Sequence, residues 1–168
     1  MLHVITTFRR LPFGALMKVY EKTNLEQGRE QWPWETPERQ LALAQEAFCD
    51  YLQRCFFRIP GAAYCLWLVE DQPVSALRYE PYGHGVLITA LETAPDSTGK
   101  GYATELLKQT LEHLREEGIR KVCVHIHRGN RASIRVHKRC GFTQIARGAK
   151  LLDGSYRSDF DTFGIDLE

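Results

Sequence analysis

The stretch Pro95-Asp96-Ser97-Thr98-Gly99-Lys100-Gly101-Tyr102-Ala103-Thr104-Glu105-Leu106-Leu107 decides how this chain is interpreted. The apolar run before it, residues 86–93, predicts a strand, and the residues after Gly101 have the spacing of an amphipathic helix. A glycine turn between a strand and a helix directs several backbone N–H groups to one point at the positive end of the helix dipole. The stretch therefore indicates a phosphate site, although a tight turn that binds nothing has the same signature.

Two other phosphate motifs are excluded by the residues around this turn. A P-loop needs glycine where Ala94 stands and a serine or threonine where Gly101 stands. A dinucleotide fingerprint needs a third glycine where Thr104 stands, and an acid after the next strand, where the chain has Arg128-Gly129-Asn130.

A second motif follows about thirty residues later, Asn130-Arg131-Ala132-Ser133-Ile134-Arg135-Val136-His137-Lys138-Arg139-Cys140-Gly141-Phe142. It predicts a helix capped by asparagine, followed by a glycine and an aromatic residue that opens a strand. With this motif, residues 86–142 resemble the GNAT superfamily of N-acetyltransferases. The first family signature, Q/R-x-x-G-x-G/A, is met by Gly101 and Ala103, and the Asn-helix-Gly-Phe signature by Asn130 to Phe142. The chain departs from the family at Thr98, where relatives have glutamine or arginine, and this places the strength of cofactor binding in doubt.

The order of predicted elements agrees with an α/β (α+β) fold in one domain, residues 1–168. We expect strands at residues 2–8, 63–69, 74–79, 86–93 and 122–127, directly after Phe142, and at 160–167. We expect helices from residue 13 to about 26, over roughly twenty residues from Thr36-Pro37, from Gly101 to Gly118, and from Asn130 to about Cys140. These elements predict a mixed, mostly antiparallel sheet of six to seven strands with a parallel βαβ splay and helices on both faces.

Composition indicates an ordinary protein of the cytoplasm. Of the 168 residues, 43% are hydrophobic and 26% charged, with a net charge of +1, so neither a nucleic-acid nor a membrane partner is expected. Five cysteines without a C-x-x-C pair favour reduced thiols over a disulfide framework. No secretory leader is expected in the first residues.

The resemblance implies acetyl-CoA as the co-substrate, with its diphosphate held by the turn. Leu91 and Thr93 are then expected to contact the pantetheine arm through their main chain, and Asn130 to reach it from the opposite side. Lys100 adds positive charge, unless it is only a solvated turn lysine. The cofactor-binding residues expected in this way are Leu91, Thr93, Thr98, Gly99, Lys100, Gly101, Tyr102, Ala103, Thr104, Asn130 and Ser133.

Two residues are candidates for proton transfer. Glu92 lies on the strand beside the cofactor and is our candidate base, since an amine must lose a proton to attack a thioester; the alternative is an exposed strand-end glutamate. His137 stands where many relatives have a tyrosine that protonates the departing thiolate, and histidine can donate a proton near neutral pH. The alternative is a surface histidine on a basic helix.

Of the expected sites, the acceptor site is the one about which the sequence says least. The resemblance brings the loop with Trp32, Trp34 and Glu35 over the acceptor, and His125 and His127 point to one side of the neighbouring strand. Each of these residues also fits a role in packing or at the surface. Two histidines without a third ligand make a poor zinc site, so no metal is expected. The acceptor is a small-molecule or peptide amine, and the protein is a monomer or homodimer.

We therefore expect an N-acetyltransferase that moves an acetyl group from acetyl-CoA to a primary amine by direct attack in a ternary complex. A non-catalytic, regulatory module that binds coenzyme A or an acyl-CoA is the alternative. An acyltransferase with a longer acyl donor is a third possibility.

Overall fold

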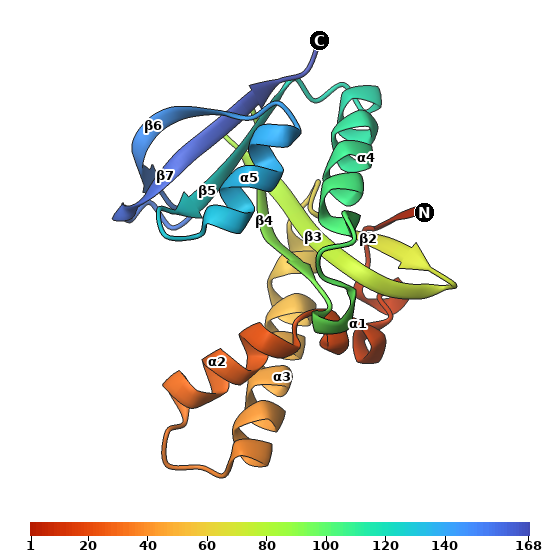
Figure 1. The fold of residues 1–168 in the computed structure, drawn as a ribbon, viewed down its shortest axis with the longest axis vertical. Coiled ribbons are helices and arrows are strands. Elements are labelled where there is room, and N and C mark those ends of the chain that lie inside the picture. The colour runs from red at the N-terminus through yellow and green to blue at the C-terminus, as the bar shows by residue number, and fades with distance from the viewer.

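A computed structural model describes all of residues 1–168 and contains one seven-stranded sheet in the order β1-β2-β3-β4-β5-β7-β6. The strands are β1 (Leu2–Ile5), β2 (Ala63–Val69), β3 (Gln72–Tyr82), β4 (Gly85–Thr93), β5 (Lys121–His127), β6 (Thr143–Lys150) and β7 (Tyr156–Asp166). The α-helices are α1 (Phe13–Val19), α2 (Glu21–Gln31), α3 (Pro37–Arg54), α4 (Tyr102–Glu116) and α5 (Arg131–Arg139). The predicted mixed sheet with helices on both faces is confirmed (Figure 1).

The sheet splits between β4 and β5, its one parallel pair. Only three residue pairs join the two strands: Val86 with Val122, Leu87 with Cys123, and Ile88 with Val124. Beyond Ile88, β4 pairs only with β3, and beyond Val124, β5 pairs only with β7. Figure 1 shows the two halves of the sheet diverging from this point. The predicted parallel splay is therefore confirmed.

A bulge at Ala90 bends β4 where the separation begins. The register between β3 and β4 shifts between Ala76, which pairs with Glu92, and Arg78, which pairs with Thr89. Ala90 has a φ of 54°, a left-handed conformation that alanine seldom adopts, and the Tyr20 hydroxyl donates to its carbonyl oxygen at 2.7 Å. Bulges of this kind increase local twist and redirect side chains beside functional sites.

Each face of the sheet carries its own hydrophobic core. Strand β2 alternates between them: Ala63 and Cys65 belong to the core under α4, and Tyr64 and Leu66 to the core under the first three helices. This confirms that β2 is buried on both faces, as its continuous apolar run predicts. Helices α4 and α5 lie on one side of the sheet and α1 to α3 on the other (Figure 1).

The predicted helix at residues 13–26 is instead two helices, α1 and α2, that meet at Tyr20. Tyr20 is only 2% exposed, and its ring packs edge-on against Phe48 and Tyr64. These contacts and the hydroxyl bond to Ala90 hold the residue inward and redirect the chain.

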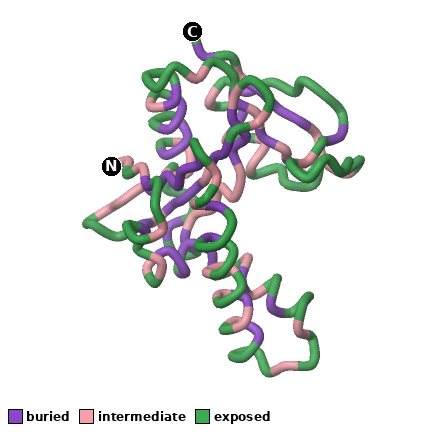
Figure 2. The backbone as a smooth tube through the Cα atoms, turned by 180° about the vertical axis from the view of Figure 1, so that it is seen from behind, coloured by how far each residue is buried: buried purple, intermediate pink, exposed green.

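Helix α2 then continues to Gln31, so the loop that contains Trp32 and Trp34 joins α2 to α3. The two helices form a hairpin that projects from the body of the protein (Figure 1), and its end is largely exposed (Figure 2). Strands β3 and β7 are also longer than predicted, and β1 is shorter. None of the helices combines the length and the apolar character needed to cross a membrane.

Candidate active site

The turn before α4 exposes a row of backbone N–H groups. Gly99 and Gly101 have φ values of 76° and 83°, a region that glycine enters without strain, and a Cβ added at either would meet nothing within 4 Å. No backbone N–H group from residue 98 to residue 104 donates to a protein acceptor. Gly101 is also the N-cap of α4 and has no side chain to satisfy these donors. The turn therefore suits a diphosphate at the start of a long helix.

The two polar side chains of this turn fold back onto it. The Thr98 hydroxyl donates to the carbonyl oxygen of Pro95 at 3.2 Å, and the Lys100 ammonium donates to that of Asp96 at 3.3 Å. Thr98 therefore stabilises the turn itself, and the turn presents its main-chain donors. The exposed Lys100 ammonium lies beside these donors on a flexible stem.

A cleft of about 830 Å³ lies between the separated strands β4 and β5 and reaches α5. It brings together both candidate catalytic residues and several predicted cofactor contacts; these lining residues are Leu91, Glu92, Thr93, Thr98, Asn130, Ser133 and His137. His125 and His127 line it too. The residues from Gly99 to Thr104 do not line this cleft, but follow directly after Thr98 at its edge.

His137 is buried, with 1% of its surface exposed, and its tautomer follows from its contacts. Its Nδ1 lies 2.8 Å from the Ser133 carbonyl oxygen, which can only accept, so Nδ1 carries the proton. Nε2 is buried without a partner. Burial lowers the pKa of His137, which favours the neutral ring with its lone pair on Nε2.

Glu92 is half-buried and accepts a hydrogen bond from a neighbouring helix. Burial raises the pKa of its carboxyl group, and a hydrogen bond donated by the Thr23 hydroxyl opposes the rise. Thr23 lies on α2, so this helix helps to hold the carboxylate in place. A raised pKa brings an acid toward the range useful for a base at neutral pH.

Asn130 and His127 each accept a hydrogen bond from a main-chain N–H group close in sequence. Asn130 caps α5 by accepting from the Ser133 N–H at 3.1 Å. His127 accepts from the Gly129 N–H at 3.0 Å, and its Nε2 lies 3.8 Å from Asp159.

The tautomer of His125 also follows from its contacts. The Thr162 hydroxyl donates its proton to the carbonyl oxygen of Gly148, so it can only accept from Nδ1 of His125, 3.1 Å away. Nδ1 of His125 therefore carries the proton. Burial lowers the pKa of His125. No cluster of three or more His, Cys, Asp or Glu side chains is arranged to hold a metal ion.

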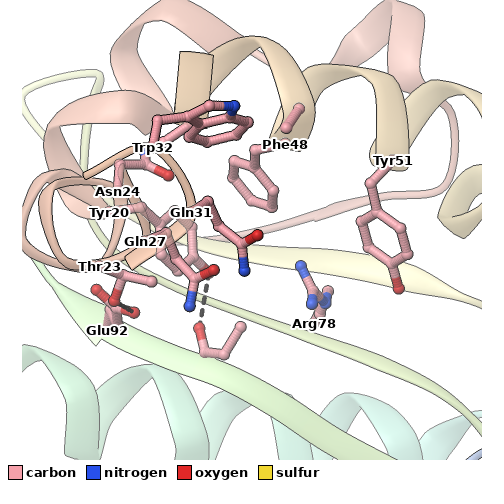
Figure 3. A pocket seen from close by; sticks show the side chains of 13 residues that line it. Tyr20, Thr23, Asn24, Gln27, Gln31, Trp32, Phe48, Tyr51, Arg78 and Glu92 are labelled. Carbon is pink, nitrogen blue, oxygen red and sulfur yellow. Dashed lines mark hydrogen bonds between the residues drawn. The ribbon is translucent and has the colours of Figure 1, made fainter. Parts of the chain in front are cut away.

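A second cavity, of about 530 Å³, opens between α2, α3 and the sheet (Figure 3). It shares Thr23, Ala90 and Glu92 with the first cleft, so both spaces border Glu92. Its other lining residues are Tyr20, Asn24, Gln27, Gln31, Trp32, Ala44, Ala47, Phe48, Tyr51 and Arg78.

Of the predicted acceptor residues in the loop, Trp32 lines this cavity. Trp34 is 76% exposed, and neither it nor Glu35 lines either space.

Sequence reasoning missed most of this second cavity, although two signals point to it. Residues 20, 23, 24, 27 and 31 recur at helical spacing and are mostly polar, which is unusual for the inward face of a helix. Arg78 interrupts an apolar strand, which is also unusual for a residue facing a core.

Residues 20–142 match the acetyltransferase (GNAT) family, so this chain belongs to that family. Over 87 residues it is 30% identical to the L-methionine sulfoximine/L-methionine sulfone acetyltransferases of Pseudomonas aeruginosa and Pseudomonas paraeruginosa. This match covers 47% of the chain and 51% of each relative, about half the length of each.

Two of the solved structures that share the fold are N-acetyltransferases bound to coenzyme A. The PaiA N-acetyltransferase of Thermoplasma acidophilum, in complex with coenzyme A, superposes with a TM-score of 0.63 at 12% identity, over 99% of both chains. The spermidine N-acetyltransferase of Vibrio cholerae, in complex with coenzyme A and spermine, superposes with a TM-score of 0.64 at 15% identity. The match covers 99% of this chain and 95% of the Vibrio protein.

Proposed function

We propose that this protein transfers an acetyl group from acetyl-CoA to a primary amine held beside Glu92. The observation that carries the proposal is that two cavities border this residue. One lies beside the turn with free N–H donors, and the other opens between α2 and α3. Attack in a ternary complex needs two such sites that share one reacting centre.

On the cofactor side, the main-chain N–H groups of residues 98–104 bind the diphosphate, and Asn130 and Ser133 lie along the pantetheine path. Acetyl-CoA supplies the acetyl group as a thioester. A main-chain N–H at Leu91 or Thr93 polarises the thioester carbonyl, since both residues line the splayed part of β4. Similarity to a neighbour solved with coenzyme A supports this choice of co-substrate.

On the acceptor side, Glu92 takes the proton from the attacking amine, directly or through a water. The half-buried carboxyl group has a raised pKa, and the hydroxyl of Thr23, which lines both cavities, donates a hydrogen bond to it. His125 and His127 line the same cleft and are alternative proton acceptors, of which His125 is the more enclosed.

His137 is proposed as the proton donor to the leaving thiolate. Because Nδ1 is committed to Ser133, donation from Nε2 requires the doubly protonated ring, which burial disfavours. Its contribution should therefore decline as the pH rises through its lowered pKa.

The relatives named above act on amines: methionine sulfoximine and methionine sulfone in one case, spermidine in the other. We propose a small-molecule acceptor of this general kind, or a peptide amine, with residues 1–168 working as a single domain in the cytoplasm, as a monomer or homodimer.

Release of free thiol from acetyl-CoA in the presence of a panel of amines tests the proposal. The expected result is amine-dependent thiol release with formation of an N-acetyl product, identified by mass spectrometry. Longer acyl thioesters in the same assay establish the acyl chain that is preferred. Binding of acetyl-CoA without turnover of any amine would contradict the enzyme and favour the regulatory module.

A further inference from the structure

Arg78 brings a positive charge into the cavity between α2, α3 and the sheet. It lies in the middle of β3, and its guanidinium carbon is 5.8, 5.1 and 5.6 Å from the ring centres of Phe48, Tyr51 and Phe56. Aromatic faces attract a cation and fix its position. They do not satisfy the N–H donors in the guanidinium plane.

Those donors have no carboxylate acceptor in the protein. Their polar neighbour is the neutral Tyr64 hydroxyl, which is itself buried without a hydrogen bond of normal geometry. No hydrogen bond from the guanidinium group is present, and its Nε is buried without a partner. The six ion pairs of the molecule do not include Arg78. An arginine keeps its charge at any physiological pH, so unpaired buried donors cost free energy unless a ligand satisfies them.

The nearby acids do not satisfy this charge. The charge of Arg78 lowers the pKa values of both Glu80 and Glu92, but burial is the larger effect on each and raises both values. Glu80 is 5% exposed and lines neither cavity, and the Glu92 carboxylate accepts from Thr23. The site therefore lacks an anionic group that a bound molecule can supply.

The register of the sheet places Arg78 within reach of the same molecule as Glu92. Ala76 pairs with Glu92, and Arg78 is two residues further along β3, roughly 7 Å at strand spacing. Figure 3 shows Glu92 and Arg78 along the strands, with Gln27 and Gln31 between them in this view and the rings of Trp32 and Phe48 above. One small molecule can thus present an amine to the carboxylate and an anion to the guanidinium.

We propose that the acceptor is an amino acid, an amine that also carries a carboxylate, with the carboxylate bound by Arg78. This inference rests on the proposed acetyl transfer and specifies the substrate class. The planar guanidinium fits a carboxylate through two parallel hydrogen bonds. The aromatic walls formed by Trp32, Phe48 and Tyr51 favour an apolar remainder on the acceptor.

Pairs of amines that differ only in the carboxylate test this assignment. L-Leucine is compared with 3-methylbutylamine and L-phenylalanine with phenethylamine, and β- and γ-amino acids vary the distance between the two groups. The wild-type protein should prefer the best carboxylated member by about tenfold or more in kcat/KM, as expected for a charged hydrogen bond. Arg78→Met should abolish this preference, mainly through KM, and Arg78→Lys should retain part of it.

Arg54→Met is the matched control, because Arg54 is an exposed arginine at the end of α3 that lines neither cavity. It should keep the full preference. Affinity for acetyl-CoA and thermal melting confirm that each variant is folded. If no amine releases thiol, the proposed function fails. If carboxylated and plain amines turn over equally in the wild-type protein, or if folded Arg78→Met keeps the preference, the function stands and this inference is wrong.

Discussion

At the scale of single residues, the proposed chemistry depends on Glu92 and Thr23. Burial of the Glu92 carboxyl group raises its pKa, so the basic form appears only as the pH rises through this raised value. A rate that depends on this base should therefore increase with pH on the acidic side of its profile. The Thr23 hydroxyl stabilises the ionised form of Glu92 and thereby sets the pH range of this rising, acidic limb of the profile.

Thr23→Val should move that limb to higher pH. The variant keeps the size of the side chain but removes the donor, so the pKa of Glu92 rises further and less of the base is available at a given pH. On the limb, kcat/KM should fall roughly threefold to tenfold. The measurement is the pH dependence of kcat/KM, with Thr23→Ser, which keeps the hydroxyl, as the control. An unchanged profile in Thr23→Val would show that this carboxylate is not the base.

At the scale of elements, the hairpin of α2 and α3 depends on one close approach. A Cβ added at Gly28 would lie 2.5 Å from the carbonyl oxygen of Gln40 on α3. This atom belongs to the backbone and cannot rotate away, so the helices touch because residue 28 has no side chain. The contact keeps α2 over the cavity between α2, α3 and the sheet, which residues of both helices line.

Gly28→Ala should separate the two helices and destabilise the protein by about 1–3 kcal/mol, the usual cost of inserting a methyl group into a packed contact. It should also raise KM for the amine more than KM for acetyl-CoA, since the other cleft lies between β4 and β5. Chemical denaturation and steady-state kinetics measure the two effects.

Gly14→Ala is the control, because a Cβ there meets nothing within 4 Å on α1, and stability should stay the same or rise by up to about 1 kcal/mol. Equal behaviour of the two variants would contradict this account of the hairpin.

The elements also show what could be predicted from sequence. The turn at Gly99 and Gly101 and the amphipathic α4 are local patterns, so both were predictable. The break at Tyr20 was not, because it depends on Ala90, Phe48 and Tyr64, which are distant in sequence.

At the scale of the whole molecule, the fold arranges the site by letting the sheet separate. Three pairs hold β4 to β5, and the bulge at Ala90 then turns β4 away, which opens the cleft on one side and brings Glu92 to the other cavity. The sequence and its family resemblance predicted the parallel splay of the sheet. They did not predict Arg78 or Thr23 as site residues, since a strand arginine and a helix threonine gain a role only once α2 covers β3 and β4.

The central claim is that the main-chain amides of residues 98–104 bind the diphosphate of coenzyme A. Gly101→Glu places a carboxylate at these donors, and Gly154→Glu is its matched control: both glycines have nearly the same φ, 83° and 84°, and open space at the Cβ position. Both substitutions therefore bring similar backbone strain and the same charge, but only the first lies at the proposed site.

Calorimetric titration with coenzyme A is the most direct test. The account predicts that the wild-type protein and Gly154→Glu bind with equal affinity and that Gly101→Glu binds about tenfold or more weakly. Equal affinity in Gly101→Glu and Gly154→Glu would contradict it.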